Sequence, residues 1–175
     1  MDFKYGNGTP SVFNIVKKGQ ASPILTGNEK KPIVVVGTYE NSKLIALPKK
    51  EMVRWFNEKD HRFEIFINNI VKFVTNGSCI NYLNCYSSID DSASYKGLKN
   101  RVIGIINFWE FNYTDLTDQI RSNNWHFVVS GTFWINESRN GVMQLLSLYG
   151  ICPTPFREDT TWFIDGNICQ NLTVD

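Results

Sequence analysis

Two apolar runs separated by a short polar stretch form the clearest pattern in the chain. The first run covers Ile33 to Val36 and the second covers Leu44 to Leu47, with Glu40-Asn41-Ser42 between them. Val and Ile favour a pleated, half-buried strand, and Asn and Ser are common where a chain reverses. The pattern therefore predicts a β-hairpin over residues 31–47.

Helical periodicity follows the hairpin. Apolar residues at 63, 66, 67, 70, 71 and 74 give one continuous stripe, and Asn76-Gly77 predicts the end of this helix. Three shorter helices are predicted over Lys49 to Asn57, over Asp115 to Ser122 with Thr114 as the N-cap, and over Val142 to Tyr149 with Gly150 as the stop.

The remaining apolar runs predict strands. Pro23 begins the sheet, Arg101 to Ile106 forms a buried central strand, and Trp125 to Ser130 follows a turn at Asn123-Asn124. Short strands are also predicted at Ile80 to Leu83 and at Thr160 to Ile164, whereas Cys152 to Pro155 is expected to break the chain. Helices alternate with strands after the hairpin, which indicates an α/β layer fold with a largely parallel sheet.

The length of 175 residues suits a single domain over 1–175, with an extended lead-in over 1–22 and a C-terminal extension over 156–175. The longest apolar runs are about five residues, far below the roughly 18 needed for a membrane span. Residues 1–50 hold eight Lys against three acidic residues, 8 − 3 = +5. With neither an Arg-rich stripe nor an RNA-binding motif beside that charge, we expect no nucleic-acid partner.

Four cysteines are present in the chain, and none belongs to a Cys-x-x-Cys pair. Their spacing resembles no structural zinc module, so no metal site is expected. The most natural disulfides join Cys79 to Cys85 and Cys152 to Cys169, although four cysteines allow three pairings and buried free thiols are an equal alternative.

Five Asn-x-Ser/Thr sequons are about twice the number expected by chance, and they are glycosylation candidates if the protein is secreted: Asn7, Asn76, Asn112, Asn136 and Asn171. The first residues contain no apolar signal core. The protein is therefore either cytoplasmic, or secreted or at the cell surface after removal of a leader.

Several short motifs occur in an order and spacing that resemble a known domain. They are Gly8-Thr-Pro-Ser11, Ala21-Ser-Pro-Ile-Leu25, the run from Pro32 to Leu47, the helix end at Val74-Thr75, Val128-Val-Ser-Gly-Thr-Phe-Trp134 and Leu145-Leu-Ser-Leu-Tyr-Gly-Ile151. The chain resembles the amidotransferase-like N-terminal domain of TRP-channel-associated factors, which is also attached to enhancin- and mucinase-type zinc metallopeptidases.

This resemblance implies a three-layer, flavodoxin-like fold of the class I glutamine amidotransferase type. The sequence departs from the family in two places. The glycine pair before the second-half strand is Asn123-Asn124 here, and the glycine of the hairpin turn is replaced by Glu40-Asn41-Ser42. The segment around Cys79 and Cys85 has no counterpart in the family pattern.

Catalytic motifs of both related enzyme classes are missing from the sequence. A class I amidotransferase needs a Gly-x-Cys-x-Gly elbow, but the matching turn reads Ser130-Gly-Thr-Phe133. A zincin needs His-Glu-x-x-His, but His61 is followed by Arg62 and His126 by Phe127. We therefore expect no enzyme activity, and the metallopeptidase relationship makes this chain an accessory domain. His126 is expected to be a satisfied edge or core histidine.

Aromatic residues follow two predicted strands at their carboxyl ends, where open α/β sheets bind ligands: Trp109, Phe111, Phe133 and Trp134. They predict a platform for a glycan or a protein, with core packing as the alternative.

The first hypothesis for the function is a non-catalytic interaction module without a cofactor. One alternative is a glycosylated, disulfide-bonded subunit of an extracellular or surface assembly. The other is a hydrolase that uses Cys152, His126 and a carboxylate.

Overall fold

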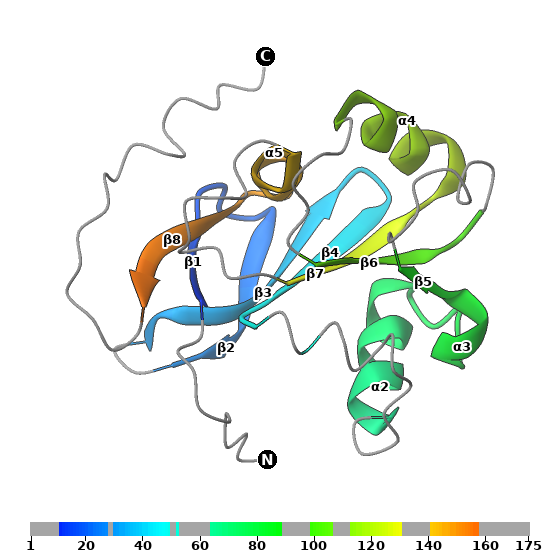
Figure 1. Ribbon diagram of the computed structural model, residues 1–175, viewed down its shortest axis with the longest axis horizontal. Coiled ribbons are helices and arrows are strands. Elements are labelled where there is room, and N and C mark those ends of the chain that lie inside the picture. The colour runs from blue at the N-terminus through cyan, green and yellow to red at the C-terminus, as the bar shows by residue number, and fades with distance from the viewer. Residues whose placement is uncertain are drawn as a thin grey trace.

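The computed structural model describes residues 11–27, 30–49, 52, 64–88, 99–106, 113–130 and 141–157. A six-stranded sheet in the order β2-β3-β4-β7-β6-β5 runs through the molecule (Figure 1). Its strands are β2 (Ala21–Thr26), β3 (Pro32–Tyr39), β4 (Ser42–Leu47), β5 (Tyr86–Ser88), β6 (Val102–Ile106) and β7 (His126–Ser130). A second, two-stranded sheet pairs β1 (Ser11–Ile15) with β8 (Ile151–Arg157).

The six-stranded sheet is antiparallel at one end and parallel at the other. Strands β2, β3 and β4 form an antiparallel meander, whereas β4, β7, β6 and β5 run parallel. The predicted hairpin is confirmed, because Tyr39 pairs with Ser42 across a two-residue turn. Glu40 begins this turn with a φ of 52°, in the left-handed region. The predicted buried strand at 101–106 is also confirmed as β6, which lies between β7 and β5.

Helices cover both faces of the sheet (Figure 1). On one face lie α2 (Glu64–Val74) and α3 (Tyr82–Cys85), whose buried side chains form a core with Val34, Ile45, Leu47, Val102 and Val128. On the other face lie α4 (Tyr113–Asn123) and α5 (Gly141–Leu148), together with β1 and β8. Their core partners on the sheet are Val35, Leu44, Ala46, Ile103, Ile105, Phe127 and Val129. The three-layer α/β prediction is therefore confirmed.

The two most strongly patterned helices are where the sequence predicts them. Helix α2 buries its apolar stripe and ends at Asn76 and Gly77, which adopt positive φ values of 53° and 79°. The Gly77 N–H donates to the Lys72 carbonyl at 2.7 Å, as in a helix C-cap. Helix α5 likewise ends before Gly150, at a φ of 73°.

The prediction that Thr114 caps α4 is wrong, because the helix begins one residue earlier, at Tyr113. Periodicity defines which segment is helical but locates its ends only to within a residue or two. The turn after this helix is confirmed, since Asn124 adopts a φ of 54° before β7 begins.

The predicted strand at 80–83 is also wrong, because this segment enters the short helix α3 and the strand β5 follows it. Local hydrogen bonds favour the helix: the Asn81 side chain accepts from the Leu83 N–H, and the Tyr86 N–H donates to the Tyr82 carbonyl. The Cys79–Cys85 disulfide closes the same turn.

The prediction that residues 152–155 break the chain is wrong, because they belong to strand β8. Among the described strands, β8 pairs only with β1, and an edge strand of this kind tolerates Pro153 and Pro155, which lack an N–H group for a second ladder. Of the predicted helix over 49–57, Lys49 and the buried Met52 are described. The predicted strand over 160–164 and most of the C-terminal extension lie outside the described residues.

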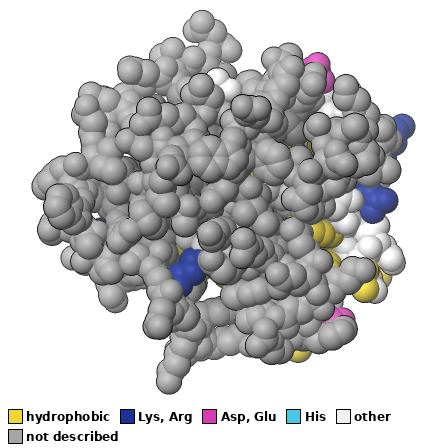
Figure 2. Space-filling model, in the orientation of Figure 1, with side chains coloured by type: hydrophobic (Ala, Val, Ile, Leu, Met, Phe, Trp, Pro, Cys, Tyr) yellow, Lys and Arg dark blue, Asp and Glu magenta, His cyan; other side chains and the backbone are white. Residues whose placement is uncertain are grey.

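Hydrophobic, basic and other polar side chains lie next to one another at the right of the view in Figure 2. Exposed apolar residues of the α2 and α3 region include Ile65, Ile80 and Leu83. No helix within the described ranges is long and apolar enough to span a membrane.

Candidate functional site

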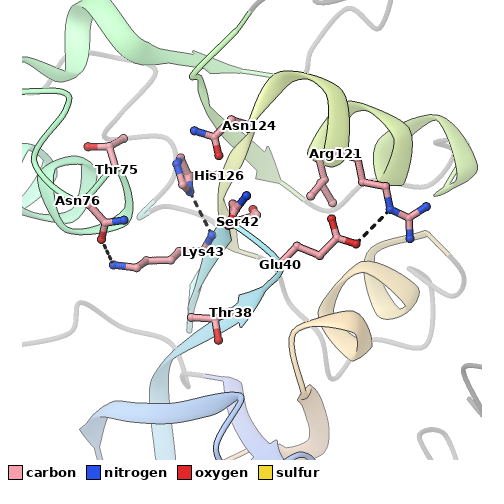
Figure 3. Close-up of a pocket in the computed structure, with 11 residues that line it drawn as sticks. Thr38, Glu40, Ser42, Lys43, Thr75, Asn76, Arg121, Asn124 and His126 are labelled. Atoms are coloured by element: carbon pink, nitrogen blue, oxygen red, sulfur yellow. Dashed lines mark hydrogen bonds and ion pairs between the residues drawn. The ribbon is translucent and has the colours of Figure 1, made fainter.

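A pocket of about 510 Å³ lies at the amino ends of the parallel strands β4 and β7. The carboxyl-terminal ends of α2 and α4 form its sides, and the β3–β4 turn completes it (Figure 3). Its lining residues are Thr38, Glu40, Asn41, Ser42, Lys43, Thr75, Asn76, Ile120, Arg121, Asn124 and His126. Ten of these eleven side chains are polar, which makes the pocket a hydrogen-bonding site.

Three left-handed residues shape the rim of the pocket. Glu40, Asn76 and Asn124 have φ values of 52°, 53° and 54°. Asn is enriched in this conformation because its short amide can bond locally, and here it ends α2 and follows α4. The local sequence therefore places two side-chain amides, at Asn76 and Asn124, where the chain turns from a helix toward the sheet.

Lys43 reaches across the pocket toward the end of α2 (Figure 3). Its Nζ donates to the Phe73 carbonyl at 3.1 Å and to Asn76 Oδ1 at 2.5 Å, and it lies 4.6 Å from the centroid of the Phe73 ring. A helix C-terminus carries a negative partial charge, so a cation there is stabilised. The ammonium group of Lys43 therefore already has hydrogen-bond and ring contacts at the end of α2.

Arg121 forms the second charged pair of the pocket. Its Nε lies 3.1 Å from Glu40 Oε1, and its guanidinium also donates to the Tyr39 hydroxyl at 3.2 Å. The hydrogen bond to Glu40, followed by that to Tyr39, raises the pKa of Arg121. The side chains of Arg121 and Glu40 are 57% and 42% exposed, so the pair contributes little to stability but does neutralise both charges.

His126 is buried at the start of β7, with 4% of its surface exposed. The Lys43 backbone N–H donates to His126 Nδ1 at 3.1 Å. Because an N–H can only donate, Nδ1 must carry the lone pair and Nε2 must carry the hydrogen of the neutral ring. Burial, and then the positive charge of Lys43, lower the pKa of His126 from 6.5 to about 4. His126 is therefore a buried histidine that is neutral near pH 7, with one ring nitrogen hydrogen-bonded.

Several polar groups around the pocket are left for a ligand. Among the described residues, no hydrogen-bond partner is found for His126 Nε2, for Asn124 Oδ1 or for the Asn41 amide. The Asn124 Nδ2 group is occupied, since it donates to Asn100 Oδ1 at 3.1 Å. The pocket thus offers both donors and acceptors on neutral groups.

The described residues contain no group of three or more His, Cys, Asp and Glu side chains that could hold a metal ion. At the opposite edge of the sheet, Ser130 ends β7 with a fully buried hydroxyl. Within the part of the chain that the structure describes, the Ser130 Oγ has no hydrogen-bond partner.

Among the predicted site residues, the four aromatic candidates at 109, 111, 133 and 134 lie outside the described ranges, as do the sequons at 7, 112, 136 and 171. The sequon at Asn76 is exposed and lines the pocket. The Cys79–Cys85 disulfide is confirmed, with 6.3 Å between the Cα atoms. Cys152 is also disulfide-bonded, whereas Cys169 lies outside the described residues.

Sequence reasoning missed the pocket, because its lining comes from four separate segments, around 40, 75, 121 and 126. The sequence does contain one indication of the pocket, namely an asparagine after each flanking helix, because it predicts a helix end at Asn76 and a turn at Asn124. Nothing in the sequence indicated that the two turns meet.

Comparison with known proteins finds solved structures of similar fold, but it finds no family to which the chain can be assigned. No family model matches the chain, and no curated protein matches it. A structure of the IMPa metallopeptidase from Pseudomonas aeruginosa matches with a TM-score of 0.59 at 12% identity, over 85% of this chain and 20% of that chain. The same enzyme in complex with an O-glycopeptide gives a TM-score of 0.57 at 13% identity, and in complex with T-antigen it gives 0.59 at 12%.

At these identities the likeness shows the fold alone. The chain spans about a fifth of the length of the structures that it matches. These neighbours agree with the metallopeptidase part of the resemblance, whereas the amidotransferase-like relationship stays a prediction.

Proposed function

We propose that this chain is a non-catalytic binding module that recognises a glycan or a glycosylated protein. The observation that carries the proposal is the polar pocket between the ends of α2 and α4, where the charges of Lys43 and Arg121 are satisfied internally and neutral donors and acceptors are left over. Sugars present hydroxyls that both donate and accept, and a site of this composition suits them.

The structural neighbours support the same class of ligand. Two of the three matching structures are described as complexes of IMPa with an O-glycopeptide or with T-antigen. Because this chain corresponds in length to a fifth of that enzyme, its role is that of an accessory domain that brings a glycosylated target to a larger protein. The fold is of the flavodoxin-like, amidotransferase-like type implied by the sequence motifs.

The disulfide of Cys152 supports a non-catalytic role. A thiol nucleophile must be free and ionised, and a disulfide sulfur is neither. The bond therefore weighs against the rival hydrolase hypothesis, which uses Cys152 as the nucleophile and His126 as the base. The hydrogen bond from the Lys43 N–H to His126 Nδ1 weighs against the base as well.

The test is a binding and cleavage assay on the same material. The 175-residue chain is applied to an array of neutral, sialylated and sulfated O-glycans, and is incubated separately with an O-glycopeptide that is followed by mass spectrometry. We expect binding to part of the array and an uncleaved peptide. Cleavage of the peptide by the purified chain, or no binding to any glycan, would overturn the proposal.

A disulfide-bonded structural subunit of an extracellular assembly is the second candidate, and the Cys79–Cys85 bond favours it because disulfides persist in oxidising compartments. Intact mass before and after glycosidase and reductant tests this role. A mass without glycans and with four free thiols contradicts it.

A further inference from the structure

From the pocket chemistry we infer that the bound group is an uncharged sugar ring, held by the Nε2–H of His126 and the Oδ1 of Asn124, and that anionic groups are excluded. This inference rests on the proposed function, and it names the ligand class and the contacts.

The two hydrogen-bonding groups are fixed before a ligand arrives. The Lys43 backbone N–H sets the tautomer of His126, so Nε2 always presents a donor to the pocket. The Asn124 Nδ2 group is held by Asn100 Oδ1, so its Oδ1 presents an acceptor. Both residues are drawn lining the pocket in Figure 3, and Asn124 comes two residues before His126, which begins β7. A donor beside an acceptor matches one sugar hydroxyl, or two adjacent ones.

The burial of His126 increases what its Nε2–H group can contribute to ligand binding. The residue is 4% exposed and lines the pocket, and its Nε2 has no hydrogen-bond partner among the described residues. Because Nδ1 is taken by the Lys43 N–H, Nε2 is the ring nitrogen that remains for a ligand in the pocket. A donor in such a position gains most from a ligand oxygen, because water reaches it poorly.

Charge argues against an anionic ligand. Lys43 bonds the end of α2 and Arg121 bonds Glu40, so an anion would have to compete with contacts that already exist. The ends of α2 and α4 that face the pocket are carboxyl-terminal, and exposed helix carbonyls repel negative charge. Phosphate and carboxylate sites use the opposite helix end, where N–H groups are free.

The experiment uses NMR titration of the chain with T-antigen as the neutral probe and sialylated T-antigen as the anionic probe. We expect shifts of pocket resonances with T-antigen and weaker binding of the sialylated form. His126→Asn keeps an acceptor for the Lys43 N–H but removes the Nε2 donor, and Asn124→Gly removes the amide while tolerating the left-handed backbone. Each variant should weaken binding about tenfold, the effect of one lost hydrogen bond.

The matched control is Lys30→Gly, which like Asn124→Gly replaces an exposed left-handed residue, here at a φ of 59°, but removes no lining group of the pocket. It should retain binding within about threefold. Binding of T-antigen that both pocket variants leave unchanged would overturn the assigned contacts while the proposed function stands. Tighter binding of the sialylated form would overturn the uncharged-ligand inference. Binding to neither probe nor to any glycan of the array would instead refute the proposed function itself.

Discussion

The buried imidazole of His126 predicts a specific dependence of stability on pH. Burial and the nearby charge of Lys43 hold the pKa of His126 at about 4 in the folded chain, against 6.5 for an unperturbed histidine. Between these values the unfolded chain binds a proton that the folded chain does not. The contribution is therefore complete above about pH 6.5 and is lost progressively as the pH falls toward 4.

The size of the effect follows from the pKa difference. One pKa unit corresponds to about 1.36 kcal/mol, so the loss at about pH 5 is roughly 2 kcal/mol for a ring fully shielded from water. Solvent in the pocket screens part of this penalty. We therefore expect the free energy of unfolding to fall by about 1 kcal/mol between about pH 7.5 and about pH 5 because of His126 alone.

The assay is urea unfolding of the native chain and of His126→Asn at several pH values. The two proteins differ in no other titratable group, so the difference in pH dependence isolates residue 126. The native chain should lose more stability than the variant as the pH falls. Equal losses, or an imidazole resonance of folded His126 that titrates near pH 6.5, would refute the reasoning.

A second variant separates the two causes of the pKa shift. Lys43→Met removes the charge but keeps the backbone N–H that bonds His126 Nδ1. Since the Lys43 charge lowers the pKa of His126, its removal should raise that pKa, which should stay below 6.5 because burial is the larger cause. An unchanged pKa would show that burial acts alone.

Three further predictions concern stability, measured by urea or thermal unfolding. Replacing both Cys79 and Cys85 with Ala should cost about 2 kcal/mol, the value for a closed loop this short, and no loss would show that the bond adds nothing. Gly37→Ala should cost about 1–3 kcal/mol, because a Cβ there would lie 2.4 Å from the Tyr149 carbonyl oxygen, and an unchanged melting temperature would contradict this packing. Ser130→Ala should be neutral or stabilising by up to about 1 kcal/mol, because no described residue hydrogen-bonds its buried hydroxyl, whereas a clear loss would reveal a bound partner.

The sequence predicts those parts of the fold that depend on local pattern. The hairpin of β3 and β4 and helix α2 each combine a clear apolar period with a turn or stop signal, and the structure has them as expected. Strand β8 was missed because Pro153 and Pro155 argue locally against a strand, and the pairing with β1 that permits them is a long-range contact. Local reasoning has no access to such a partner.

The candidate site was not predictable for the same reason. Its chemistry depends on contacts between residues distant in sequence, such as the Lys43 N–H with His126 Nδ1 and the Lys43 Nζ with Asn76. The sequence does indicate a buried histidine at the start of a strand and left-handed asparagines after two helices. The order of the strands, with β7 next to β4, brings them together.

The position of the pocket bears on the proposed binding function, because the pocket lies away from the place where the resemblance puts a catalytic elbow. The resemblance places that elbow at Ser130, at the carboxyl end of β7, whereas His126 begins the same strand. Four residue steps of about 3.3 Å place the two positions roughly 13 Å apart, on opposite edges of the sheet. The pocket draws its described lining from the amino ends of the strands and from the carboxyl-terminal ends of α2 and α4, and Ser130, the elbow residue that the structure describes, is not part of it. The proposed binding function therefore depends on groups at the amino end of β7, and it does not require a nucleophile at the carboxyl end of that strand.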